Sequence, residues 1–204
     1  SLCGEIETLQ KAGVSVTPEN FKISERATIV FPYHRALDGL EEARLKDKKY
    51  GSTLRGIAPV YSDKYQKKTI MAGELLYPEK LWPRLESILE WKNLTLERVY
   101  GAKPYTMDDL KAWVAEYGEK IKPYICDTGA FLRKANKEGK KILFEAQLGS
   151  LRDLDYGIYP MTTSSNPIVA YAPVGSGYPE AKIEKVVGVV KAYSSCVGEG
   201  PFTC

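Results

Sequence analysis

The residues best suited to hold an anion lie at positions 51–59, in the sequence Gly-Ser-Thr-Leu-Arg-Gly-Ile-Ala-Pro. The two glycines permit tight turns that expose backbone N–H groups, and two hydroxyls and a guanidinium add further donors. The surrounding stretch, residues 41–70, contains eight Lys and Arg against four Asp and Glu. We therefore predict a phosphate-binding loop here, with an ordinary surface turn beside a solvated helix as the alternative.

A second polar segment covers residues 162–167, in the sequence Thr-Thr-Ser-Ser-Asn-Pro. Short polar side chains compete for backbone hydrogen bonds, so they favour turns and helix N-caps over regular structure. The N–H groups of such a turn can face a phosphate. A capped turn without a ligand is the alternative interpretation.

Other reactive side chains are expected to be structural. His34 is the only histidine and follows a strand-like run, which is typical of a packed residue; one histidine also disfavours a zinc site. Asp153 and Asp155 lie two apart in a loop, as turn-forming residues do. Cys126 falls in an apolar helical pattern, which indicates core packing.

Several classes of protein are excluded. The sequence has no G-x-x-x-x-G-K-[ST] phosphate loop and no G-x-S-x-G nucleophile elbow. No apolar run approaches the roughly 20 residues that span a bilayer. The net charge of +3 is too small to indicate a nucleic-acid binder. Four tyrosines lack interleaved basic residues, so we expect them to pack or line a pocket rather than stack on bases: Tyr156, Tyr159, Tyr171 and Tyr178.

The composition is that of a globular protein. Of the 204 residues, 44% are hydrophobic and 27% charged, which excludes a disordered tail, a collagen-like fibre and a coiled coil. The four cysteines show no C-x-x-C spacing, and we expect free thiols in a reducing, cytoplasmic setting. No secretory leader is visible. Because the sequence opens without Met, we expect it to be a piece of a longer protein.

The helices and strands that position these loops are predicted from the spacing of apolar residues and from Gly, Pro and capping residues. Helices are predicted over residues 1–10 and 34–45, from Pro78, from Thr106 with Asp109 as a capping box, and from Pro123 to Gly139. Strands are predicted over residues 27–31, 142–146 and 185–193. The order predicts an α/β fold, part of a mostly parallel central sheet with a helix-rich inserted lobe. The expected segments are 1–33 in the sheet domain, 34–140 as the lobe carrying the loop 51–59, and 141–204 in the sheet domain with a nucleotide-binding loop at 149–178.

Several longer motifs carry a family resemblance. Residues 144–151 (FEAQLGSL), with Asp153, Asp155, Gly157 and residues 163–166 (TSSN), resemble the signature of the adenylosuccinate synthetases. The same family is matched, in the same order, by residues 23–27, 33–38, 51–53, 55–57, 63–64, 191–195 and 197–202. The resemblance runs from end to end of the chain and covers the middle of the family's sequence, roughly half of it.

The resemblance implies a purine-biosynthesis ligase, which condenses IMP with L-aspartate at the expense of GTP, with magnesium. It implies activation of the 6-oxygen of IMP by phosphoryl transfer and displacement by the aspartate amine. The family's catalytic Asp and His, its GTP contacts and its aspartate loop lie outside these 204 residues. We therefore expect no catalytic residue and no metal ligand here, and no activity from this piece alone. The family also implies a homodimer with no nucleic-acid or membrane partner.

What carries over by resemblance is part of the IMP site. Thr53, with Gly51, Ser52 and Arg55, matches the family's loop that contacts the IMP phosphate, and Thr163 matches the second threonine on that phosphate. Three further positions complete the set: Lys67, which would reach the partner subunit's IMP site, Leu148, and Val197 beside the ribose. We expect Thr53 and Thr163 to converge on one bound monophosphate.

The chain departs from the family in this same pocket. Lys67 replaces an arginine and loses its bidentate fork, and Leu148 replaces a glutamine that contacts IMP. Leu54, Arg152 and Cys196 are further departures. They leave two alternatives open: a divergent ligase that uses another purine monophosphate or amine, and a non-catalytic nucleotide-binding paralogue.

Overall fold

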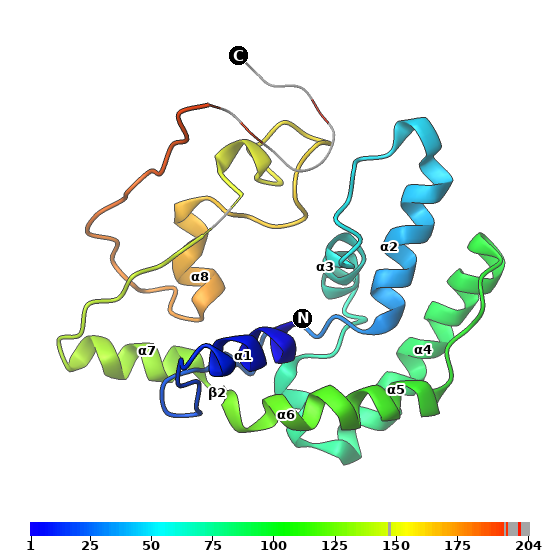
Figure 1. Ribbon diagram of the computed structural model, residues 1–204, viewed down its shortest axis with the longest axis horizontal. Helices are drawn as coiled ribbons and strands as arrows, with labels where there is room; N and C mark the ends of the chain where they lie inside the picture. The colour runs from blue at the N-terminus through cyan, green and yellow to red at the C-terminus, as the bar shows by residue number, and fades with distance from the viewer. Residues whose placement is uncertain (147, 194, 196–199, 201–204) are drawn as a thin grey trace. The chain divides into compact units, whose positions relative to one another are not determined.

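The computed structural model describes residues 1–146, 148–193, 195 and 200 (Figure 1). The chain forms two compact units, each made of two separate stretches of sequence. The first unit contains Ser1–Phe31 and Gln66–Thr128, and the second contains Pro32–Tyr65 and Gly129–Cys204.

The first unit is mostly helical and holds a small parallel sheet. Strands β1 (Ile23–Ser24) and β2 (Ile125–Cys126) pair in parallel, with Ile23 opposite Ile125. Its α-helices are α1 (Leu2–Lys11), α4 (Pro78–Tyr100), α5 (Met107–Trp113) and α6 (Glu119–Ile121). Short 3₁₀-helices cover Ala72–Leu76 and Lys122–Tyr124, and a π-helical turn covers Val114–Gly118.

The longest helix, α4, shows why this sequence is helical. Pro78 occupies the first turn, where its missing N–H costs nothing, and Gly101 ends the helix with a left-handed φ of 61°. Apolar side chains at helical spacing form the buried stripe: Leu81, Leu85, Ile88, Leu89 and Leu96. This stripe, together with Leu75, Leu110 and Phe31, makes the core of the first unit.

The predicted capping box at the start of α5 is confirmed. The Thr106 hydroxyl accepts a hydrogen bond from the Asp109 N–H at 3.1 Å, and the Asp109 carboxylate accepts one from the Thr106 N–H at 2.8 Å. Hydrogen bonds from Thr106 also hold the pKa of Asp109 below its ordinary value. The local sequence alone therefore fixes where this helix begins.

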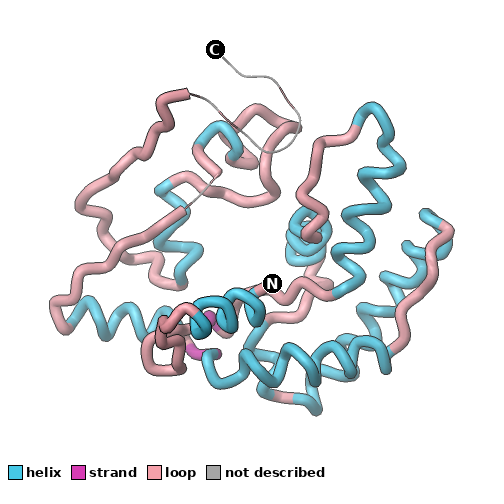
Figure 2. Tube along the Cα trace, in the orientation of Figure 1, coloured by secondary structure: helices cyan, strands magenta, loops and turns pink. Residues whose placement is uncertain are grey.

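The second unit consists of a helix pair and a long, mostly irregular segment. Helices α2 (Pro32–Leu45) and α3 (Ile57–Tyr65) pack against each other (Figure 1). Helix α7 (Thr128–Lys137) leads into the long segment, where helical turns occur at Ser150–Arg152, Val169–Tyr171 and α8 (Ala172–Ser176). Loops make up most of the chain beyond α7 (Figure 2).

His34 is a structural residue, as the sequence analysis expected. Its side chain on α2 is fully buried, and its Nε2 lies 2.9 Å from the carboxylate of Asp63 on α3, which is also buried. A polar pair of this kind stabilises the two helices only while both partners are present. The pair therefore ties α2 to α3.

Three strand predictions are wrong. Residues 142–146 and 185–193 are not in strands, and within 27–31 only Thr28 forms an isolated bridge, to Met71. A strand needs a neighbour for its backbone, and the described residues place none beside 142–146 or 185–193. Val189 and Val190 are accordingly 94% and 90% exposed.

Two local details near Cys126 also differ from expectation. Pro123 lies in a 3₁₀ turn rather than opening an α-helix, and Cys126 lies in β2 rather than in a helix. The helical spacing of the apolar residues misled here because pairing with β1 decides the conformation of β2. The fold is thus mixed and helix-rich with a small parallel sheet; the inserted lobe and the three expected segments stay predictions.

Two further findings concern thiols and membranes. Cys3 and Cys126 are free thiols in the described part of the chain. None of the helices in the described residues is both long and apolar enough to cross a bilayer.

Truncating Leu85 tests the assignment of the α4 stripe to the core. Leu85 is fully buried, whereas Leu94 on the same helix is 47% exposed. We expect Leu85→Ala to lower the free energy of unfolding by about 2–5 kcal/mol, because it leaves a cavity. Leu94→Ala should cost about 0.5 kcal/mol or less. Urea unfolding of both variants gives the comparison; equal losses would contradict the assignment.

Candidate anion-binding site

Two carboxylates on α2 hold the loop that joins α2 to α3. Asp38 and Glu42 are four residues apart, so they share one face of the helix. Glu42 accepts hydrogen bonds from the N–H groups of Tyr50 and Gly51, at 3.1 and 3.0 Å. Asp38 accepts one from the Ser52 hydroxyl at 2.7 Å and one from the Gly56 N–H at 2.8 Å. The loop is thereby anchored along its whole length.

The backbone of this loop adopts left-handed conformations. Gly51, Leu54 and Gly56 have φ values of 70°, 56° and 80°, and the Ser52 hydroxyl accepts a hydrogen bond from the Leu54 N–H at 3.2 Å. A Cβ on Gly56 would lie 2.9 Å from backbone atoms of His34 and Arg35 on α2. Glycine is therefore required at position 56 by both conformation and space.

Between Gly51 and Gly56, the polar side chains of Thr53 and Arg55 are exposed. Both lie between Ser52 and Gly56, the two residues that Asp38 holds. A hydroxyl and a guanidinium on a fixed turn are suitable donors to an anion. The other predicted donors, the N–H groups of Gly51 and Gly56 and the Ser52 hydroxyl, are held by Glu42 and Asp38. That the loop binds a phosphate stays a prediction.

The second polar loop is folded back on the segment that precedes it. The Thr163 N–H donates to the Arg152 carbonyl at 2.9 Å, and the Leu154 N–H donates to the Ser165 carbonyl at 3.1 Å. Asn166 donates to the Asp155 carboxylate at 2.7 Å. The hydroxyls of Thr163 and Ser165 lie 3.3 Å apart. The loop is therefore fixed by backbone pairing as well as by side chains.

Asp153 is the buried centre of this second loop. Its Oδ1 accepts hydrogen bonds from the N–H groups of Asp155 and Tyr156, at 3.0 and 3.1 Å. Burial alone would raise the pKa of this carboxyl, but bonds from those N–H groups, from that of Ile168 and from Asn166 hold it below its ordinary value. The prediction that Asp153 forms a turn is confirmed, whereas Asp155 bonds to Asn166.

Tyr61 links the two loops. It lies in the first half of α3, which starts directly after the first loop, and its side chain hydrogen-bonds to Ser165 of the second. Burial is the main reason that the pKa of Tyr61 lies above its ordinary value, and the bond to Ser165 opposes it. A connection therefore runs from Thr163 through Ser165 and Tyr61 to α3.

The comparisons with known proteins decide the family. The family model for adenylosuccinate synthetase matches residues 1–204. The chain belongs to the adenylosuccinate synthetase family. It is 44% identical over 202 residues to the adenylosuccinate synthetase of Ligilactobacillus salivarius, with 99% of this chain and 46% of that protein aligned. It is 46% identical over 202 residues to the adenylosuccinate synthetase of Thermoanaerobacter sp. (strain X514), with 99% of this chain and 47% of that protein aligned.

A solved structure supports the same family. The fully ligated adenylosuccinate synthetase of Plasmodium falciparum superposes with a TM-score of 0.83 and 30% sequence identity, over 97% of this chain and 47% of that one. The chain thus spans about half the length of the relatives that it matches.

Three predicted site residues lie outside these two loops. Leu148 is 57% exposed and has a left-handed φ of 82°. Lys67 belongs to the first unit, where it lines a pocket of about 300 Å³ with Lys68, Arg84, Ser87, Ile88 and Trp91. Val197 lies outside the described residues. That Thr53 and Thr163 share one phosphate stays a prediction.

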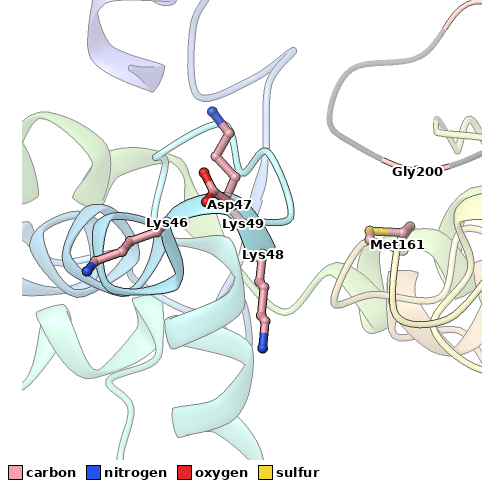
Figure 3. Close-up of a pocket in the computed structure, with 6 residues that line it drawn as sticks. All are labelled: Lys46, Asp47, Lys48, Lys49, Met161 and Gly200. Atoms are coloured by element: carbon pink, nitrogen blue, oxygen red, sulfur yellow. The ribbon is translucent and has the colours of Figure 1, made fainter.

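A larger pocket, of about 500 Å³, lies within the second unit. It is lined by Lys46, Asp47, Lys48, Lys49, Met161 and Gly200. The three lysine side chains point in different directions rather than toward one point (Figure 3). The pocket therefore does not form a convergent anion site.

The sequence analysis missed the supporting residues Asp38, Glu42 and Tyr61. The spacing of the two carboxylates, four apart on a predicted helix before a glycine-rich loop, was the available signal. No spacing in the sequence indicates the contact of Tyr61 with Ser165, because about a hundred residues separate them. In the described part of the chain, no group of three or more His, Cys, Asp or Glu side chains could hold a metal ion.

Alanine at position 56 tests the close approach of the loop to α2. Gly56 and Gly139 both have left-handed φ values, 80° and 73°, but a Cβ on Gly139 meets nothing within 4 Å. We expect Gly139→Ala to cost about 1–2 kcal/mol for the left-handed conformation alone. Gly56→Ala should cost at least about 1 kcal/mol more, because its Cβ also collides with α2. Chemical denaturation measures the difference, and equal losses would show that the loop is not packed on α2.

Proposed function

We propose that this chain supplies the phosphate-binding loops of an adenylosuccinate synthetase. That enzyme is a ligase of purine biosynthesis, which forms adenylosuccinate from IMP and L-aspartate while GTP is hydrolysed. Membership of the family supports the activity, and the geometry of the second unit supports the part that this chain plays in it.

One observation carries the assignment of the site. An anchored turn exposes Thr53 and Arg55, and the helix that follows it hydrogen-bonds through Tyr61 to the loop that contains Thr163. Two donor-rich loops from distant parts of the sequence are thus connected within one unit. This connection supports a single monophosphate held by both.

Each proposed residue has a limited task. Thr53, Arg55 and Thr163 would bind the phosphate of IMP. Gly51 and Ser52, whose N–H and hydroxyl are held by Glu42 and Asp38, would shape the loop around it. Leu148 and Val197 would lie along the rest of the nucleotide, and Lys67 would reach toward the IMP site of a partner subunit in a homodimer. None of these residues takes part in a covalent step of the reaction. Their contribution is to bind and orient IMP, which is much of what a protein provides in phosphoryl-transfer chemistry.

GTP and magnesium are proposed for the enzyme and not for these residues. Magnesium prefers carboxylate and phosphate oxygens, and the described residues bring no three acidic or metal-binding side chains together. Both oxygens of Asp38 and Oδ1 of Asp153 already accept hydrogen bonds from N–H or hydroxyl donors. This part of the chain therefore does not fit the ion. A cytoplasmic location accords with the proposed reaction.

A different purine monophosphate is the second candidate substrate. Leu148 stands where the family has a glutamine, so an amide that can donate and accept is replaced by an apolar side chain. Titration calorimetry of the gene-encoded protein with IMP and with other purine monophosphates distinguishes the two. A clear preference for IMP would dismiss the alternative.

Removing the threonine hydroxyls tests the phosphate site. We expect Thr53→Ala and Thr163→Ala each to weaken IMP binding by about 1–3 kcal/mol, because each loses a hydrogen bond to a charged group. Inosine, which lacks the phosphate, should bind all three proteins equally. Thr95→Ala on α4 is the control, because Thr95 only bonds the carbonyl one turn before it. Unchanged IMP affinity in both variants, measured by calorimetry, would remove the assignment.

The wild-type protein provides the test of the reaction itself. We expect the gene-encoded protein to form adenylosuccinate from IMP, L-aspartate and GTP with magnesium, detected by the absorbance of the product. A reaction mixture without GTP is the control and should give no product. No product with any purine monophosphate or amine would refute the ligase.

A further inference from the structure

The segment that follows Lys67 is held by backbone hydrogen bonds within the first unit. The Ile29 N–H donates to the Ile70 carbonyl at 2.9 Å, and the Ala72 N–H donates to the Ala27 carbonyl at 2.7 Å. Pairing of this kind satisfies the buried backbone groups of both segments. It therefore fixes the chain a few residues beyond Lys67.

Helix α4 contributes two side chains that contact the same segment. Arg84 and Trp91 are seven residues apart, so they share one face of the helix. The Nη2 of Arg84 donates a hydrogen bond to the Thr69 carbonyl at 2.9 Å. The Lys68 ammonium lies 3.7 Å from the centre of the Trp91 ring, which is within the range of a cation–π contact. Helix α4 therefore contacts both of the residues that follow Lys67.

Lys67 itself is exposed and has a left-handed φ of 61°. A residue with a side chain adopts this conformation only where its surroundings impose it. The neighbouring charges are engaged, because the Nε of Arg84 lies 3.2 Å from the Glu74 carboxylate and Lys68 lies over Trp91. Within the part of the chain that the structure describes, the Lys67 side chain makes no hydrogen bond or ion pair. Its ammonium is therefore available to a ligand.

We propose that Trp91 is a positioning residue, which fixes the backbone at Lys67 through its contact with the neighbouring Lys68. The proposal rests on the proposed function, in which Lys67 reaches toward the IMP site of a partner subunit. A lysine ammonium is a compact charge on a flexible stem, without the rigid fork of an arginine. Its contribution therefore depends on where the backbone places it. Holding that backbone reduces the conformational freedom lost when the side chain binds.

Removing the Trp91 ring tests its contact with Lys68 in the gene-encoded protein. We expect Trp91→Leu to raise KM for IMP about three- to tenfold. The value of kcat at saturating IMP should change less than about twofold, because Lys67 binds and does not react. Trp91→Phe keeps an aromatic face for the ammonium and should stay within about twofold of wild type. Lys68→Gln is a second test variant, in case Trp91→Leu does not fold, and should raise KM in the same direction.

A double-mutant cycle shows whether Trp91 acts through Lys67. Lys67→Ala should itself raise KM for IMP, and Trp91→Leu should then change KM less than about twofold further, because the residue that it positions is gone. An equal increase in both backgrounds would overturn the proposal. Tyr77→Leu is the matched control, because it removes a ring 5.3 Å from the Lys80 ammonium at the start of α4. We expect its KM to stay within about twofold of wild type.

NMR of the protein with ¹³C-methylated lysines detects the contact directly. The ring current of Trp91 should shift the methyl signals of Lys68 upfield, and Trp91→Leu should abolish that shift; Lys68→Arg identifies the signals. No upfield signal, or an unchanged KM in both Trp91→Leu and Lys68→Gln, would overturn the proposal. If Lys67→Ala leaves KM unchanged, the proposed function fails at Lys67 and the positioning role falls with it. The NMR result then still decides whether Trp91 holds Lys68.

Discussion

The hydrogen bonds that the Asp38 carboxylate accepts are the constraint on which the rest of the site depends. They fix a short turn against the helix that precedes it, and they do so on both sides of the exposed donors. A buried carboxylate is costly unless its oxygens are satisfied, and here the loop satisfies them. The helix and the loop therefore stabilise each other. A change in the loop that removed these donors would leave a buried charge behind.

Two further contacts fix the position of α2 relative to α3. His34 and Asp63 join the two helices in the interior, and Gly56 lets the connecting loop pass within contact distance of α2. Because both ends of the loop are held, a shift of the loop along α2 would break its hydrogen bonds to Asp38. Tyr61 then extends the arrangement to the second loop through Ser165.

Local signals in the sequence predict the helices well, and non-local pairing limits the rest. The reciprocal bonds of Thr106 and Asp109, the proline at the start of α4 and the glycine at its end depend on neighbours a few residues away. Residues 185–193 have the composition of a strand, but a strand exists only where another lies beside it. The glycines of residues 51–59 predict a tight turn, and the left-handed φ values of Gly51 and Gly56 confirm it. Its link through Tyr61 was not, because that contact joins distant parts of the chain.

The departures from the family pattern divide the site into two parts with different constraints. The donors proposed for the phosphate, Thr53 and Thr163, resemble the family's residues at these positions. They lie on loops held by Asp38 and by backbone pairing. Leu148 departs from the family and is exposed in a left-handed turn, with 57% of its surface free. Every nucleoside monophosphate has the same phosphate, whereas the bases differ. The loops that carry Thr53 and Thr163 could therefore bind the phosphate of any nucleoside monophosphate. A preference for a different base would depend first on residues such as Leu148.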